Sequence, residues 1–147
     1  TDTTLMKRND VYYTKDTNKP YSGPVFTLYE NGQISKEGTL KNGKINGPYR
    51  FYHQNGQLKV NGNFRDGKKY GSFKSYYDNG ELKNERTFIN DIEEGLSKTF
   101  YENGQLKGEG TFVNGKLHGL FESYYENGEL EFAGTFKNGE LIESKEY

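Results

Sequence analysis

Turn dipeptides divide this chain at a constant interval, and that interval constrains the fold more than any other feature. A glycine opens each of five units, at Gly23, Gly47, Gly71, Gly95 and Gly119, a period of 24 residues. Each unit then carries a first turn, such as Asn103-Gly104, and a second turn, such as Asn114-Gly115. A strict internal period of this length indicates a repeat protein whose units stack on their neighbours.

Each unit is expected to form two strands and two tight turns. Asn-Gly between strand-forming runs is the strongest short hairpin signal, because both central residues of a type I′ turn need positive φ. No segment shows the period of a helix. We therefore predict an all-β fold: a single-layer antiparallel meander of β-hairpin repeats in a twisted or curled sheet, with five copies and a partial leading unit.

The ends of the chain differ in repeat character. Asn18-Lys19 lies one period before Asn42, so the partial leading unit begins near Asp10. Residues 1–9 carry no repeat pattern and are expected to be a flexible N-terminal segment. The sequence thus predicts one repeat domain over residues 10–147.

A two-residue turn at Asn103-Gly104 would set the pairing of the strands around it. Tyr101 then faces Leu106, and Tyr, Leu and Phe gather on one face opposite glycines that leave room for rings. The other face pairs Lys98 with Glu109, and opposite charges across a strand pair are favourable. Segments between turns alternate in length by two residues, so either the pairing slides at each unit or a bulge near the leading glycine absorbs the difference.

Composition excludes several functional classes. Lys and Arg number 20 against 21 Asp and Glu, so the basic excess of a nucleic-acid-binding protein is absent. No apolar run is long enough for a transmembrane segment. The chain has no cysteine, and His53 and His118 occupy different positions of different units. We expect no metal and no cofactor, with His53 standing in for the tyrosine of other units.

The sequence offers no catalytic constellation. Carboxylates such as Glu102 adjoin turns, where they are solvated and lack the burial or close partner that a general acid needs, and the recurring serines lack a base partner. The Gly-rich segments do not match a phosphate-binding loop. We predict no catalytic residues and no enzyme activity.

The repeat resembles the MORN-repeat variant found in bacterial proteins, most clearly in GLFESYYENGELEFAGTFKNG (Gly119 to Gly139). The resemblance covers about residues 10 to 142. It implies a twisted sheet of hairpins that serves as a binding scaffold. Bacterial chains of this kind are commonly labelled antitoxin components, and related repeats are linked to membrane lipids or protein partners. The family motif contains no catalytic residue.

The third unit departs from the pattern. Asn90-Asp91 replaces Asn-Gly, Arg86 replaces the glycine opposite Phe73, and residues 91–94 are acidic. These changes put the regular turn there in doubt. The alternatives are a recognition notch in the middle of the sheet and ordinary drift in one copy, and the tolerance of repeat loops to variation favours drift.

A second aromatic column marks a candidate binding face opposite the Tyr-Leu-Phe face. The candidate residues are Tyr52, Tyr76, Phe100 and Tyr124, with Lys59, Lys83 and Lys107 expected across from the first three of them. The column recurs at two-strand spacing, roughly 10 Å. Exposed rings beside lysines would bind a partner protein, a glycan or a lipid headgroup. Alternatively, the lysine stems cover the rings and stiffen the sheet.

The sequence favours a non-enzymatic repeat scaffold for protein–protein interaction, with an antitoxin or immunity-like role as one form of it. The alternative is an exported surface module that binds host or cell-envelope ligands, a glycan or lipid headgroup, through exposed aromatics. The expected partner is another protein, and self-association through the sheet face or edges is a further alternative. A leader removed before Thr1 would indicate export; otherwise the chain is expected in the cytoplasm.

Overall fold

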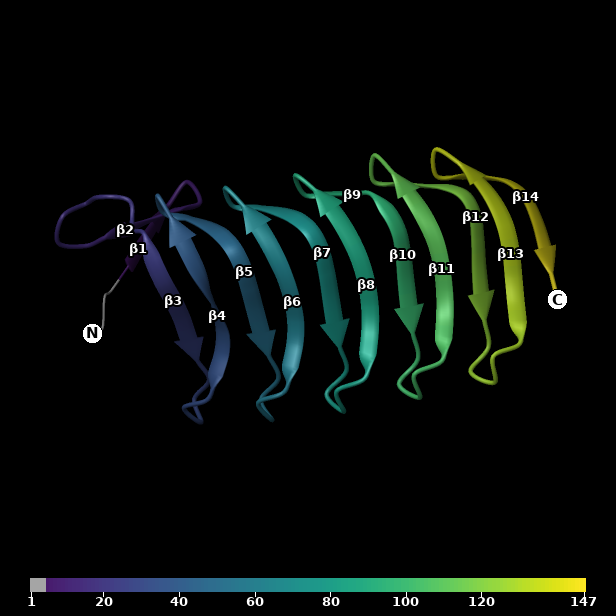
Figure 1. Ribbon diagram of the computed structural model, residues 1–147, viewed down its shortest axis with the longest axis horizontal. Coiled ribbons are helices and arrows are strands. Elements are labelled where there is room, and N and C mark those ends of the chain that lie inside the picture. Colours follow the sequence, from purple (N-terminus) through teal and green to yellow (C-terminus); the bar gives the residue numbers. More distant parts are fainter. Residues whose placement is uncertain (1–4) are drawn as a thin grey trace.

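The protein is an antiparallel β meander, described for residues 5–147 in a computed structural model (Figure 1). No helix occurs among these residues. The strands are β1 (Leu5–Arg8), β2 (Val11–Thr14), β3 (Gly23–Leu28), β4 (Ile34–Lys41), β5 (Lys44–Tyr52), β6 (Leu58–Arg65), β7 (Lys68–Tyr76), β8 (Leu82–Ile89), β9 (Ile92–Glu93), β10 (Gly95–Phe100), β11 (Leu106–Val113), β12 (Lys116–Tyr124), β13 (Leu130–Lys137) and β14 (Glu140–Glu146). The predicted all-β meander is confirmed.

The strands from β3 to β14 form one open sheet of 12 strands. Sequence neighbours are sheet neighbours along its length, and β9 and β10 both pair with β8 as two parts of one interrupted strand. Since each hairpin adds beside the previous one, equivalent positions of successive units fall into straight rows across the sheet (Figure 1).

A separate hairpin precedes the sheet. β1 pairs with β2 through a turn at Asn9 and Asp10, whose φ values are 47° and 61°. The segment 1–9, expected to be flexible, therefore includes strand β1, while residues 1–4 lie outside the described residues. The amide of Tyr12 donates to the carbonyl of Gly43 at 2.8 Å, so the leading residues contact the second turn of the next unit.

The two turns of each unit have different structures. The second turn is the predicted type I′ turn, with φ of 51° at Asn114 and 76° at Gly115. In the first turn only Gly104 has positive φ, at 84°, and its amide donates to the carbonyl of Tyr101 at 3.0 Å. This is a three-residue loop, a type I turn followed by a left-handed glycine, so the predicted two-residue turn is wrong there.

The three-residue loop changes the pairing next to it. Leu106 pairs with Phe100 rather than with Tyr101, and the register shifts before Thr99 meets Gly108. Lys107 is the extra residue of this bulge. Because loop and bulge displace the strands in opposite senses, the rest of the predicted register is confirmed, including Lys98 opposite Glu109.

A second irregularity bends each unit at its leading glycine. The segment of β11 from Gly110 to Phe112 lies opposite a longer segment of β12, from Phe121 to Leu117, so β12 has extra residues at this point. Gly119 lies within that stretch at φ 87°. The bulge at the leading glycine therefore absorbs the length difference between segments, and the strands bend near the second turns (Figure 1).

The core consists of aromatic rings that the curled sheet covers by itself. Tyr49, Phe64, Phe73 and Phe88 form a column of edge-on contacts with ring centres 5.3 to 5.8 Å apart. Two of these rings lie over glycines: a Cβ added at Gly38 would be 2.1 Å from the Tyr49 ring, and one added at Gly62 would be 2.2 Å from the Phe73 ring. The predicted role of these glycines as gaps for rings is confirmed.

The column is interrupted between the third and fourth units. Ser97 occupies the place that Phe73 and Phe121 hold in their units, and it is buried. β10 pairs with β8 through Lys98 and Glu85, so the next residues along, Ser97 and Arg86, lie beside each other. The nearby turn is regular, with φ of 52° at Asn90 and 71° at Asp91, so the doubt about its geometry was wrong. Asp91 tolerates the left-handed conformation that glycine adopts elsewhere.

Candidate functional site

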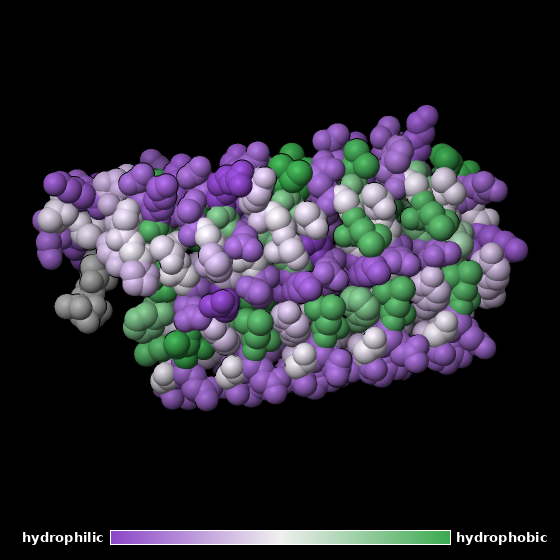
Figure 2. Space-filling model, viewed as in Figure 1, coloured by the Kyte–Doolittle hydropathy of each residue, from purple (hydrophilic) through white to green (hydrophobic). Residues whose placement is uncertain are grey.

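The face opposite the aromatic core, here the outer face, carries an apolar row across every repeat. This lower apolar row pairs Leu28 with Ile34, Tyr52 with Leu58, Tyr76 with Leu82, Phe100 with Leu106 and Tyr124 with Leu130. Figure 2 shows it as a line of apolar side chains above the first turns. Its rings are half-buried, so each retains exposed area on an otherwise uncovered sheet face.

A charged band separates this row from the second turns (Figure 2). Its charges pair across neighbouring strands, with N to O distances of 3.5 Å for Arg50–Glu37, 3.1 Å for Lys74–Glu85 and 3.4 Å for Lys98–Glu109. Hydrogen bonding to Glu85 raises the pKa of the Lys74 amine above its ordinary value. The band is therefore a line of internally neutralised charges.

Tyrosine hydroxyls join the row to the band. Tyr52 donates to Glu37 Oε1 at 2.5 Å, and this hydrogen bond raises the pKa of the Tyr52 phenol, with burial adding to it. Burial raises the pKa of the Tyr124 phenol, and the hydrogen bond that this phenol donates to Glu122 Oε2 at 3.0 Å raises it further. Both phenols are thus held neutral, and their rings are held against the sheet.

The predicted aromatic residues lie together on this row, but the predicted lysines do not face them. The partners of Tyr76 and Phe100 are leucines, because Lys59, Lys83 and Lys107 are the extra residues of bulges. The amines of Lys83 and Lys107 lie 5.2 and 5.3 Å from the ring centres of Tyr77 and Tyr101 instead. The predicted aromatic–lysine pairs are therefore wrong, and the lysines cover a different ring column.

Sequence reasoning missed a hydrogen-bonded column at the first turns. The hydroxyl of Tyr101 donates to the carbonyl of Tyr124 at 2.8 Å, and Tyr77 donates to that of Phe100 at 2.8 Å. His53 makes the matching contact, with Nε2 3.0 Å from the carbonyl of Tyr76, which agrees with its expected role as a substitute for tyrosine. Each acceptor belongs to the lower apolar row, so this tyrosine column positions the row. The 24-residue recurrence of Tyr before Asn-Gly was the available signal.

Asparagines of the first turns form a parallel column. Asn103 Oδ1 accepts from the amide of Gln105 at 2.9 Å, while its Nδ2 donates to the carbonyl of Glu126 at 3.2 Å. Asn55 and Asn79 make the same contacts to the next unit. Asparagine is needed here for its side chain, which bonds within the turn and between units, rather than for positive φ.

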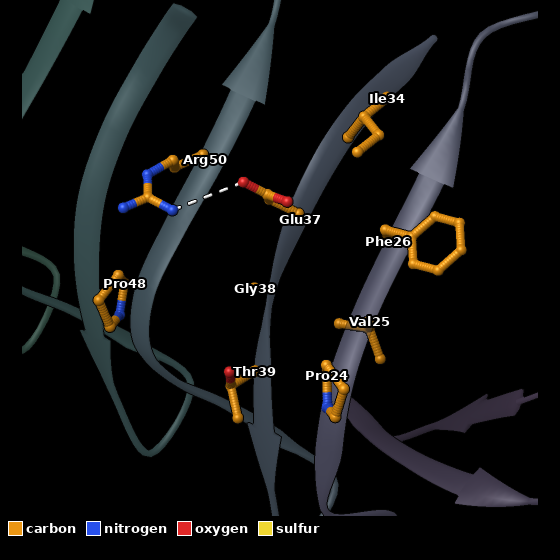
Figure 3. Close-up of a pocket in the computed structure, with 9 residues that line it drawn as sticks. All are labelled: Pro24, Val25, Phe26, Ile34, Glu37, Gly38, Thr39, Pro48 and Arg50. Atoms are coloured by element: carbon orange, nitrogen blue, oxygen red, sulfur yellow. Dashed lines mark hydrogen bonds and ion pairs between the residues drawn. The ribbon is translucent and has the colours of Figure 1, made fainter. Parts of the chain in front are cut away.

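A depression of about 360 Å³ lies where the outer face reaches the β3 edge (Figure 3). It is lined by Pro24, Val25, Phe26, Ile34, Glu37, Gly38, Thr39, Pro48 and Arg50. Phe26 is 65% exposed, and the Arg50–Glu37 pair lies on the neighbouring strands (Figure 3). The depression combines apolar surface with a paired charge, like the rest of this face.

The described residues 5–147 include no cluster of three or more His, Cys, Asp or Glu side chains placed to hold a metal ion. Within the same residues, no helix is long and apolar enough to cross a membrane.

Comparison with known families matches most of the chain. The model of the family described as MORN repeat variant matches residues 21–42, 45–66, 69–90, 93–114 and 117–138. Each matched segment is one hairpin around a three-residue loop, such as β5 with β6. A search of curated proteins finds no significant match.

Proposed function

Because the chain belongs to the MORN repeat variant family, we propose that this repeat scaffold is non-enzymatic and binds another protein through its outer face. The lower apolar row carries the proposal: five aromatic–aliphatic or aliphatic pairs lie in line across the sheet. Contiguous exposed apolar surface of this kind marks protein interaction sites. Aromatic residues also dominate the energetics of such interfaces.

The tyrosine column and the parallel column of first-turn asparagines make the lower apolar row a rigid surface. Tyr77 and Tyr101 tie each unit to the next, and each ties down the backbone of a row residue. A surface that is ordered before binding loses little conformational entropy in a complex, which favours affinity. The support is therefore a preformed, repeating apolar surface rather than a pocket.

An antitoxin or immunity-like role is the form of this function that the resemblance to bacterial repeat proteins suggests. Such a protein acts by covering its target, which requires surface complementarity and no catalytic group. The alternative is an exported module whose rings bind a glycan or lipid headgroup, and the ring spacing of roughly 10 Å supports it. The charged band argues for the protein partner over an anionic membrane, because its lysines are already paired.

The test is capture of a partner from extracts of the source cells on the immobilised chain, read by mass spectrometry. We expect one retained protein whose recovery falls about tenfold for the double variant Tyr76→Ala, Phe100→Ala. Tyr125→Ala is the matched control, since this exposed aromatic lies outside the row. Retention of no protein, or equal retention by the double variant, would refute the proposal.

A further inference from the structure

The spacing of the lower apolar row limits which backbone conformations of a partner segment can keep contact along it. Neighbouring strands lie about 4.8 Å apart, so equivalent positions of successive units repeat at about 9.6 Å. A polyproline II helix rises about 3.1 Å per residue with three residues per turn, and so presents the same edge every 9.3 Å or so. Over the four steps from Leu28 to Tyr124, the two periods drift apart by only about 1.2 Å.

Other regular conformations fit this row less well. An α-helix repeats one face over seven residues, about 10.5 Å, which accumulates a drift of about 3.6 Å over the same four steps. An extended strand repeats a face every two residues, about 6.7 Å, and neither this distance nor its double matches the row. The polyproline II period is therefore the one that keeps contact with all five units.

The chemistry of the row agrees with the spacing. Polyproline II segments dock on surfaces lined by aromatic side chains and carry little conformational entropy to lose. Here Tyr52, Tyr76, Phe100 and Tyr124 recur beside leucines, so one ring and one aliphatic side chain are offered at each of those steps.

Charge complementarity favours an uncharged partner. The charges of the band beside the row neutralise one another: Lys74 pairs with Glu85, and Lys98 pairs with Glu109. A charged partner would have to break these pairs, whereas a segment of proline and aliphatic residues leaves them intact. We propose that the lower apolar row binds a proline-rich segment of about 13 to 15 residues in the polyproline II conformation, lying across the strands. This inference rests on the proposed function and names the partner's chemistry.

Two synthetic peptides test the spacing, with binding read by fluorescence anisotropy on the full chain. One carries five Pro-Pro-Leu triplets, which place a leucine about every 9.3 Å; the other carries four Pro-Pro-Pro-Leu quartets, which place one about every 12.4 Å. Both adopt polyproline II, so they differ in register and not in conformation. We expect the triplet peptide to bind about tenfold more tightly, because its contacts add across the units.

Variants locate the site. Tyr76→Ala with Phe100→Ala should weaken triplet binding about tenfold, and Tyr125→Ala should leave it unchanged. Leu82→Gln, a single change on the same row, gives the same test if the double variant loses its β-sheet circular dichroism. Equal binding of both peptides, binding of neither, or triplet binding that these variants leave unchanged would overturn the inference.

Controls separate this inference from the proposed function. Binding of a chito-oligosaccharide or of anionic vesicles at the row, with neither peptide bound, would overturn it in favour of another ligand class. If the double variant loses a captured protein while the triplet peptide is not preferred, the proposed function stands and the inference fails. If the triplet peptide binds the row but no cellular protein is retained, the proposed function fails at its own test.

Discussion

Two equivalent interfaces of the sheet, one repeat apart, fill the same space with different residues. Between β6 and β7, the Phe73 ring lies over Gly62, and a Cβ at that glycine would be 2.2 Å from it. Between β8 and β10, the small residue and the large one change sides: Ser97 replaces the ring and Arg86 replaces the glycine. The two departures of the third and fourth units therefore face each other. The repeat requires that the summed volume of the two side chains facing each other across the strand pair stays constant. Different residue pairs can meet this requirement.

The exchange makes the interface more polar. Arg86 Nε lies 3.9 Å from Glu93 Oε1, an atom that is buried without a hydrogen-bond partner. An ion pair of this length on a half-exposed arginine contributes little stability. The regular interface is thus expected to be the stronger of the two, and each prediction below compares them.

The largest effect is expected from filling the glycine gap. Gly62→Val should destabilise the protein by about 2 to 3 kcal/mol, because its side chain would enter the volume of the Phe73 ring. Arg86→Val is the matched control at the same place in the next repeat, where Ser97 rather than a ring lies across on β10, and it should cost less than about 1 kcal/mol. Thermal denaturation followed by circular dichroism measures both; equal losses would show that the two interfaces do not differ in packing.

Restoring the regular pair should reveal coupling between the exchanged residues. Arg86→Gly alone leaves a gap, and Ser97→Phe alone crowds the arginine, so each should destabilise by about 1 to 2 kcal/mol. The double variant should recover most of this loss, with a coupling of about 1 to 3 kcal/mol in a double-mutant cycle. Urea denaturation of the four proteins measures it. Additive losses would contradict compensation across the strand pair.

The tyrosine column continues through the interruption, and this can be tested separately. Tyr77 bonds the third unit to the fourth at the Phe100 carbonyl, and Tyr101 bonds the fourth to the fifth. Tyr77→Phe and Tyr101→Phe should each cost about 1 kcal/mol, since each leaves a carbonyl without its donor. Tyr125→Phe should cost almost nothing. A much larger loss at Tyr77 than at Tyr101 would mean that the interrupted interface depends on this bond for its integrity.

The smallest effect is expected from the charged band. Lys98 Nζ lies 3.4 Å from Glu109 Oε2 beside the interruption, and the two side chains are 35% and 30% exposed, respectively. Lys98→Ala should cost about 0.2 to 0.5 kcal/mol, and 0.5 M salt should reduce the difference from the unaltered chain. The measurement is chemical denaturation at both ionic strengths. A cost above about 1 kcal/mol would make the band a main source of stability across the interrupted interface.

The two Asn-Gly turns show how much of the backbone structure the local sequence predicts. Asn114-Gly115 and Asn103-Gly104 are the same dipeptide, and the first forms the predicted type I′ turn while the second forms part of a three-residue loop. The dipeptide is compatible with both. In the three-residue loop the Asn103 side chain accepts from the amide of Gln105, and Asn127 makes the same contact in the last unit, which has no unit after it. The dipeptide alone therefore does not distinguish the two turns.

The candidate row illustrates the same limit. Its aromatic members were predicted because they recur on one face of alternating strands. Their partners were not, since the bulge at Lys107 brings Leu106 opposite Phe100. One inserted residue reverses the face of its neighbours, so a small error at the turn placed lysines where the structure has leucines opposite three rings of the row.

The sequence by itself determined the all-β class, the order of the meander, the second turns and the Lys98–Glu109 register, because these follow from local φ preferences and a strict period. Tertiary structure decided the bend at Gly119, the tyrosine column and the exchange of Arg86 with Ser97. Those features depend on contacts between units, about one period apart in the chain. Their energies are therefore set by which residues the stacked repeats bring together, and no single repeat contains that information.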